Sequence, residues 1–116
     1  MITDLSYLRS MSNDDTNFIR EMVDIFREQI ADYTTQMPEL LLKKDYDSLS
    51  KMAHKAKSSV AVMGMAREAD LLNELEQKAA EEIEKESYAA LIDTFISICG
   101  EAIDELDEQL KSMQNG

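Results

Sequence analysis

Apolar residues recur at spacings of three and four along most of this 116-residue chain, which is the period of an amphipathic α-helix. The clearest run lies between residues 18 and 37. Its apolar positions are Phe18, Ile19, Met22, Val23, Ile25, Phe26, Ile30, Tyr33 and Met37. Three later segments repeat the same spacing, so the pattern predicts four amphipathic helices.

The first of these helices follows a short helical lead-in that we expect over residues 4–9. Ser12 and Asp15 stand in the spacing of a capping box, which predicts that the long helix begins near residues 12–15. Pro38 interrupts the helix interior, but leucines continue the apolar face after it. We therefore expect this helix to kink at Pro38 and to break near Asp45.

The remaining helices are separated by short connections. The second is expected over residues 45–63, with Gly64 supplying its end, and the third over residues 65–82. The fourth begins at about Ser87 and keeps its apolar seam to the end of the chain. Four such helices most simply form an all-α, antiparallel up-down four-helix bundle with a short N-terminal helical lead-in. We expect residues 1–116 to form one domain of this kind.

The apolar arc of the first long helix covers roughly 160°, which is wider than the ~100° that one core-facing stripe requires. Two interpretations follow. Either part of this surface stays outside the core as a docking patch, or the helix is buried between two neighbours. The spacing is compatible with both.

Composition and charge exclude several classes of function. The net charge of −12 argues against nucleic-acid binding, because phosphate backbones are bound by basic surfaces. The longest apolar run, residues 60–66, is too short to cross a bilayer, and no basic and apolar leader opens the chain. We therefore expect a cytoplasmic protein. Cys99 is the only cysteine, and its place on an apolar helix face predicts a core thiol.

Positive charge is concentrated in one segment of the chain. Residues 43–57 contain five lysines and two aspartates, a net charge of +3, and they also contain His54, the only histidine. In a helix His54 points away from the apolar stripe, with Lys51 and Lys57 about one turn away on either side. An exposed imidazole beside ammonium groups suits the capture of a phosphoryl group. A single histidine on a helix can also be an ordinary surface residue.

The residues after His54 resemble a known pattern. Lys57 follows three residues later, the small residues Ser58 and Ser59 follow at four and five, and Gly64 follows at ten. This order resembles the His-x-x-Lys-Gly-Ser/Ala-x-x-x-x-Gly signature of histidine-containing phosphotransfer (HPt) domains. Ser58 stands where that family most often has glycine. The order and lengths of the predicted helices also resemble the four-helix bundle of the family.

The resemblance implies that the chain is a phosphorelay intermediate. His54 would accept a phosphoryl group from the aspartate of a receiver domain and pass it to another receiver aspartate, while Lys57 stabilises the transferring group. The partners implied are receiver domains of a hybrid histidine kinase and of a response regulator. Contacts with them are expected at Lys51, Ser58, Ala61 and Gly64.

Glu76 is a further candidate because it falls near the middle of the apolar face of the third helix, between Leu72 and Ala79. A buried carboxylate without a partner is costly, so this position needs one. In HPt domains the comparable position often holds Glu or Gln near the active imidazole, which implies that Glu76 orients His54. Alternatively, Glu76 reaches past the helix edge to water or to a lysine.

We expect this chain to hold no cofactor and no metal, since it has no Gly-rich phosphate loop and no cluster spaced for metal binding. Autokinase activity is therefore not expected, and the divalent metal would belong to the partner receiver. The protein is expected to be a monomer. A second class of function stays open: a non-phosphorylated helical adaptor or inhibitor that acts by protein–protein contact through the first long helix.

Overall fold

The computed structural model describes the backbone of residues 2–115 and the side chains of residues 2–113, and this range contains helices and no strand. The helices are α1 (Ser6–Ser12), α2 (Thr16–Leu42), α3 (Tyr46–Val62), α4 (Ala66–Glu81) and α5 (Tyr88–Asn115), with a 3₁₀ turn, η1 (Lys85–Ser87), before α5. The all-α prediction is confirmed. The predicted boundaries of the second and third long helices agree with α3 and α4 to within one residue.

The start of α2 at Thr16 directly follows the predicted range, but the cap differs from the prediction. Asp15 is the N-cap, and its carboxylate accepts hydrogen bonds from the backbone N–H groups of Asn17 (3.0 Å) and Phe18 (3.3 Å). The Ser12 hydroxyl instead donates to the carbonyl oxygen of Leu8, 2.6 Å away within α1. The predicted capping box of Ser12 and Asp15 is therefore wrong, because Ser12 belongs to the last turn of the preceding helix.

This assignment predicts different costs for two substitutions. Asp15→Ala should lower the free energy of unfolding by about 1 kcal/mol, since it removes the acceptor for two free N–H groups of α2. Ser12→Ala should change it by less than about 0.5 kcal/mol, because the hydroxyl only bonds back to a carbonyl of its own helix. Urea unfolding of both variants measures the difference. Equal losses of unfolding free energy in the two variants would support the capping box instead.

The end of α2 agrees with the prediction. The helix continues through Pro38 and ends at Leu42, shortly before Asp45. Asp45 then caps α3, its carboxylate accepting from the backbone N–H of Ser48 at 3.2 Å. The bend expected at Pro38 stays a prediction.

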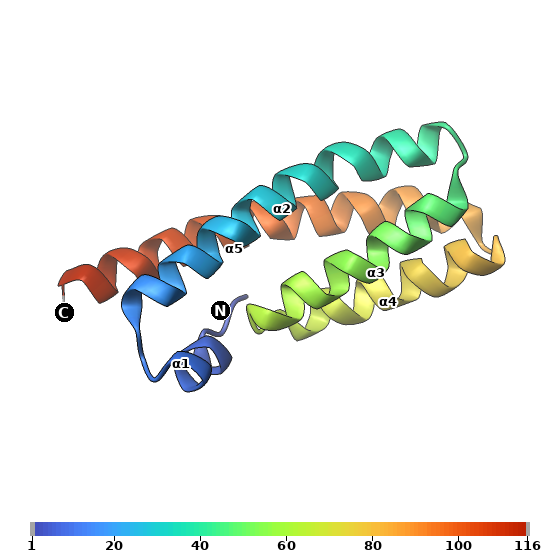
Figure 1. Cartoon of the computed structure of the whole chain (residues 1–116). Helices are drawn as coiled ribbons and strands as arrows, with labels where there is room; N and C mark the ends of the chain where they lie inside the picture. Colours follow the sequence, from blue (N-terminus) through green and yellow to red (C-terminus); the bar gives the residue numbers. More distant parts are fainter. Residues whose placement is uncertain (1, 116) are drawn as a thin grey trace.

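One apolar stripe from each long helix contributes to a shared core. α3 packs against both α2 and α4, and α5 likewise packs against α2 and α4 (Figure 1). The core includes Ile19, Val23, Phe26 and Ile30 of α2, Leu49, Ala53, Ala56 and Val60 of α3, Leu72, Leu75 and Ala79 of α4, and Tyr88, Phe95, Cys99 and Leu106 of α5. Cys99 is fully buried in this core, which confirms the predicted core thiol. The same burial raises the pKa of its thiol to about 12.

The segment before α1 is tied to two parts of the bundle. The backbone N–H groups of Ile2 and Thr3 donate to the Glu105 carboxylate of α5 at 3.0 and 2.8 Å. The N–H of Asp4 donates to the carbonyl oxygen of Met63 at 2.8 Å, beside the turn between α3 and α4. The N-terminal segment therefore joins α5 to that turn.

Gly64 occupies this turn with a φ of +73°, which is the left-handed region that favours glycine. A Cβ atom added there would lie 2.5 Å from both the Cβ and the carbonyl oxygen of Asp4. The structure thus gives Gly64 a packing role against the N-terminal segment. Across residues 2–115, no helix has an apolar stretch long enough to span a lipid bilayer.

Candidate functional site

His54 lies on the outer face of α3. Its side chain is 63% exposed, whereas Ala53 and Ala56 on the same helical turn are fully buried. The helical period explains this arrangement, because the stripe that packs into the core leaves His54 on the opposite side. The prediction that the imidazole faces solvent is confirmed.

The neighbouring helix α4 brings Glu76 to this imidazole. One carboxylate oxygen of Glu76, Oε2, lies 3.0 Å from Nδ1 of His54. The other, Oε1, accepts a hydrogen bond from the Lys57 ammonium group at 3.0 Å. The sequence left open whether Glu76 lies near the imidazole or reaches a lysine, and in the structure it contacts both.

The charge of Glu76 determines which nitrogen of His54 is free. Partial burial opposes ionisation of this carboxyl group, but hydrogen bonds from Lys57 and His54 outweigh that effect and lower its pKa. An ionised carboxylate only accepts hydrogen bonds, so Nδ1 must carry the proton that it donates to Glu76. In the neutral imidazole the lone pair is then on Nε2. Glu76 therefore engages Nδ1 and leaves Nε2 without a contact to this carboxylate.

The Lys57 ammonium group has a second acceptor on α4. The Asn73 side-chain oxygen, Oδ1, lies 3.1 Å from Nζ of Lys57, and the Lys57 side chain is 29% exposed. Sequence reasoning missed Asn73. The only signal for it is its position one helical turn before Glu76, which has meaning only when the alignment of α3 with α4 is known.

Ser50 fixes α3 to α4 at the level of the site. Its side chain is buried, and its hydroxyl donates to the backbone carbonyl oxygen of Glu76 at 2.8 Å. Sequence reasoning missed Ser50 as well. In the structure this hydrogen bond links the segment that carries the imidazole directly to the segment that carries its carboxylate partner.

Lys51 lies at the edge of the site, where it forms a solvent-exposed ion pair with Asp47 at 3.0 Å. With Ser50, His54, Lys55 and Glu76, it lines a cavity of about 360 Å³ beside the imidazole. The two flanking lysines thus differ. Lys57 contacts the partner of His54, whereas Lys51 is paired on its own helix.

A groove lies between α2 and α3, the helix that carries His54. We call it the α2–α3 groove; its volume is about 230 Å³ and its lining includes Met22, Ile25, Gln29, Ser58, Ser59 and Val62. Ile25 is 47% exposed, while Ile19 and Phe26 are buried. The wide apolar arc of α2 is therefore only partly used by the core. Ser58 lines the groove, and Ala61 is exposed one turn after it.

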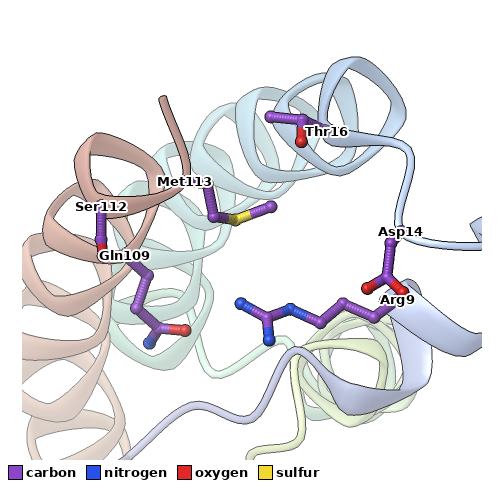
Figure 2. A pocket seen from close by; sticks show the side chains of 6 residues that line it. All are labelled: Arg9, Asp14, Thr16, Gln109, Ser112 and Met113. Carbon is purple, nitrogen blue, oxygen red and sulfur yellow. The ribbon is translucent and has the colours of Figure 1, made fainter. Parts of the chain in front are cut away.

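Another cavity, of about 390 Å³, lies where α1, the start of α2 and the end of α5 meet (Figure 2). Arg9, Asp14 and Gln109 are among its lining residues, and Figure 2 shows the Arg9 side chain extending into it. It contains neither His54 nor its partners. Within the described part of the chain, no group of three or more His, Cys, Asp or Glu residues is arranged to hold a metal ion.

Comparison with known families adds an independent finding. The model of the Hpt domain family matches residues 21–116, a range that includes His54, Lys57 and Glu76. Comparisons with curated proteins and with solved structures gave no match. Hpt domains are helical phosphotransfer modules of two-component signalling that act with receiver domains and are not classical enzymes. On this match over most of its length, the chain belongs to the Hpt domain family.

Proposed function

We propose that this protein is a phosphorelay intermediate that carries a phosphoryl group on His54 between the aspartates of two receiver domains. The observation that supports this most directly is the position of the imidazole. His54 is mostly exposed and its Nδ1 lies 3.0 Å from the Glu76 carboxylate, so Nε2 is the nitrogen left for reaction. These features are those of a nucleophile that a large partner can reach.

The proposed transfer forms one bond and breaks one. The Nε2 lone pair attacks the phosphorus of an aspartyl phosphate on the donor receiver, an N–P bond forms, and the P–O bond to the aspartate breaks. The aspartate leaves as a carboxylate, and Nδ1 keeps its proton on the hydrogen bond to Glu76. In the second step the carboxylate of another receiver attacks the same phosphorus, and the bonding pair returns to Nε2.

Lys57 stabilises the negative charge of the transferring oxygens in this proposal, from its position against Glu76. We assign receiver contacts to Lys51, Ser58 and Ala61, which are exposed on α3. The α2–α3 groove supplies apolar surface next to Ser58. Gly64, which the sequence placed with these contacts, lies at the turn that packs on Asp4, so we assign it to that packing instead.

We further infer that residues 1–116 form one domain with the antiparallel up-down arrangement of a four-helix bundle. The neighbours of each long helix support this, since α3 and α5 each pack against α2 and α4. We propose that the protein acts as a monomer without a cofactor of its own. The divalent metal that assists phosphoryl transfer would then come from the receiver.

The proposal is tested by incubating this protein with a receiver that carries a radiolabelled phosphoryl group. We expect acid-labile label to appear on the protein and to leave it when a second, unphosphorylated receiver is added. Acid lability identifies an N–P bond rather than a hydroxyl ester. Stable binding of the receiver without any transfer of label would instead support a helical adaptor.

Glu76→Gln tests what the Glu76 carboxylate contributes to transfer. The glutamine amide oxygen can still accept from Nδ1, but Lys57 loses an ionic partner, so phosphoryl transfer should slow by roughly three- to thirtyfold.

The same substitution gives a pH-dependent prediction for stability. The pKa of Glu76 is lowered from its ordinary value of 4.5 in the folded protein. The ionised carboxylate therefore stabilises the fold fully above about pH 4.5, and this stabilisation is lost as the pH falls through the lowered value.

Urea unfolding of the wild type and Glu76→Gln at several pH values measures this effect. The difference between their free energies of unfolding should be greatest near neutral pH and should shrink as the pH falls below 4.5. A difference that stays constant across this range would show that the ionised carboxylate is not what stabilises the site.

A further inference from the structure

Lys57 is held by two acceptors that lie one turn apart on α4. Its ammonium group donates to Oδ1 of Asn73 at 3.1 Å and to Oε1 of Glu76 at 3.0 Å. Only Glu76 also contacts the imidazole. Asn73 therefore touches the site solely through Lys57, and it has no part in the transfer chemistry described above.

The spacing of the four residues explains how these contacts form together. His54 and Lys57 are three residues apart on α3, and Asn73 and Glu76 are three residues apart on α4. Contacts join His54 to Glu76 and Lys57 to Asn73, which is the order of pairing that two antiparallel helices give. Residues at this spacing share one helix face. The two helices therefore present matching pairs across their interface.

A second acceptor matters because a lysine side chain is long and flexible. With Glu76 alone, the ammonium group could pivot about one ion pair, and partly exposed pairs of this kind hold their geometry weakly. Two acceptors define its position more closely. A charge that is already in place when negative charge develops stabilises transfer without reorganisation at that moment.

The residue type at position 73 is consistent with this purpose. Lys57 and Glu76 together carry no net charge, and an asparagine adds an acceptor without adding charge. An aspartate would hold the ammonium group as well, but it would place a second carboxylate near an incoming phosphoryl group. The negative charges of the carboxylate and of the phosphoryl oxygens would repel each other. A neutral acceptor holds Lys57 and keeps the site free of extra negative charge.

We propose that Asn73 is a positioning residue that holds the Lys57 ammonium group in place beside Glu76 and His54 for phosphoryl transfer. This inference rests on the proposed function of His54. It adds a residue that acts on the reaction only through Lys57, and it therefore predicts that Asn73 has no effect on transfer when Lys57 is absent.

The test is a double-mutant cycle on the rate of phosphoryl transfer from a labelled receiver. Asn73→Ala should slow transfer by about three- to tenfold in the wild-type background. This is less than a fully buried hydrogen bond to a charged group would cost, because Lys57 is partly exposed and keeps its bond to Glu76. In a Lys57→Ala background the same substitution should change the rate by less than about twofold. Gln77→Ala, an exposed position on the same helix, is the matched control and should leave the rate unchanged.

A second measurement reports on Lys57 without any transfer. The NMR signal of its ammonium group, identified by its absence in Lys57→Ala, should show faster proton exchange with water in Asn73→Ala than in the wild type. An unchanged signal, or equal slowing of transfer with and without Lys57, would overturn the positioning role. A wild-type protein that takes no acid-labile label would overturn the relay itself, and the ammonium signal would separate that result from a failure of Asn73 to hold Lys57.

Discussion

Replacing His54 with glutamine should abolish phosphorylation of this protein by a labelled receiver, with the initial rate falling at least about a thousandfold. The lone pair of the glutamine amide nitrogen is delocalised into the carbonyl group, so it cannot attack phosphorus as an imidazole nitrogen does. His54 is the only histidine in the sequence, and thus no second imidazole can take its place. The measurement is the rate at which acid-labile label appears.

The substitution should leave the fold intact, which separates a chemical effect from unfolding. The imidazole is mostly exposed, and a glutamine amide can still donate to the Glu76 carboxylate. We therefore expect the free energy of unfolding to change by less than about 1 kcal/mol. Equal labelling of His54→Gln and the wild type would place the phosphoryl group elsewhere and would contradict the proposed relay.

Gly64→Ala should lower the free energy of unfolding by an amount on the order of 2–5 kcal/mol. The left-handed conformation disfavours any side chain, and the added Cβ would meet the Cβ and carbonyl oxygen of Asp4 at 2.5 Å. Those atoms cannot move freely, because the Asp4 N–H bonds to Met63 and the adjacent Thr3 bonds to Glu105. Urea unfolding measures the loss.

Gly100→Ala is the matched control, since a Cβ added at that position meets no atom within 4 Å. It lies within α5, where alanine is the better helix former, and should stabilise the protein by about 0.5–1 kcal/mol. Gly64 is ten residues from His54, roughly 15 Å along a helix axis, so the folded fraction of Gly64→Ala should still accept label. Unchanged stability with lost transfer would instead make Gly64 a receiver contact.

Most of the helical architecture could be predicted from the sequence because its causes are local. Apolar spacing predicted which face of each helix is buried, and Asp45 and Gly64 marked the ends of α3 to within two residues. The capping box failed because Ser12 and Asp15 are both suitable N-cap residues. Asn13 and Asp14 each have a positive φ, so they separate α1 from α2 and leave only Asp15 at the start of the long helix.

The site was predictable in proportion to how much of it lies on one helix. His54 and Lys57 follow from spacing and from the resemblance of one segment to the HPt pattern. Glu76 followed partly from its unusual place on an apolar face, but its double contact with His54 and Lys57 did not. Asn73 and Ser50 were missed, because their partners lie more than fifteen residues away on another helix.

The sequence by itself determined that the chain is helical, which stripe of each helix is apolar, and that its one imidazole points away from that stripe on α3. The period of a helix fixes the direction of every side chain relative to its neighbours, so these features need no information beyond the local segment. Only the tertiary structure decided how α3 and α4 align, which depends on how their buried side chains pack. That alignment brings Glu76 into contact with Nδ1 of His54 and Asn73 into contact with the Lys57 ammonium group. The packing of α2 against α3 likewise leaves part of the apolar arc of α2 exposed.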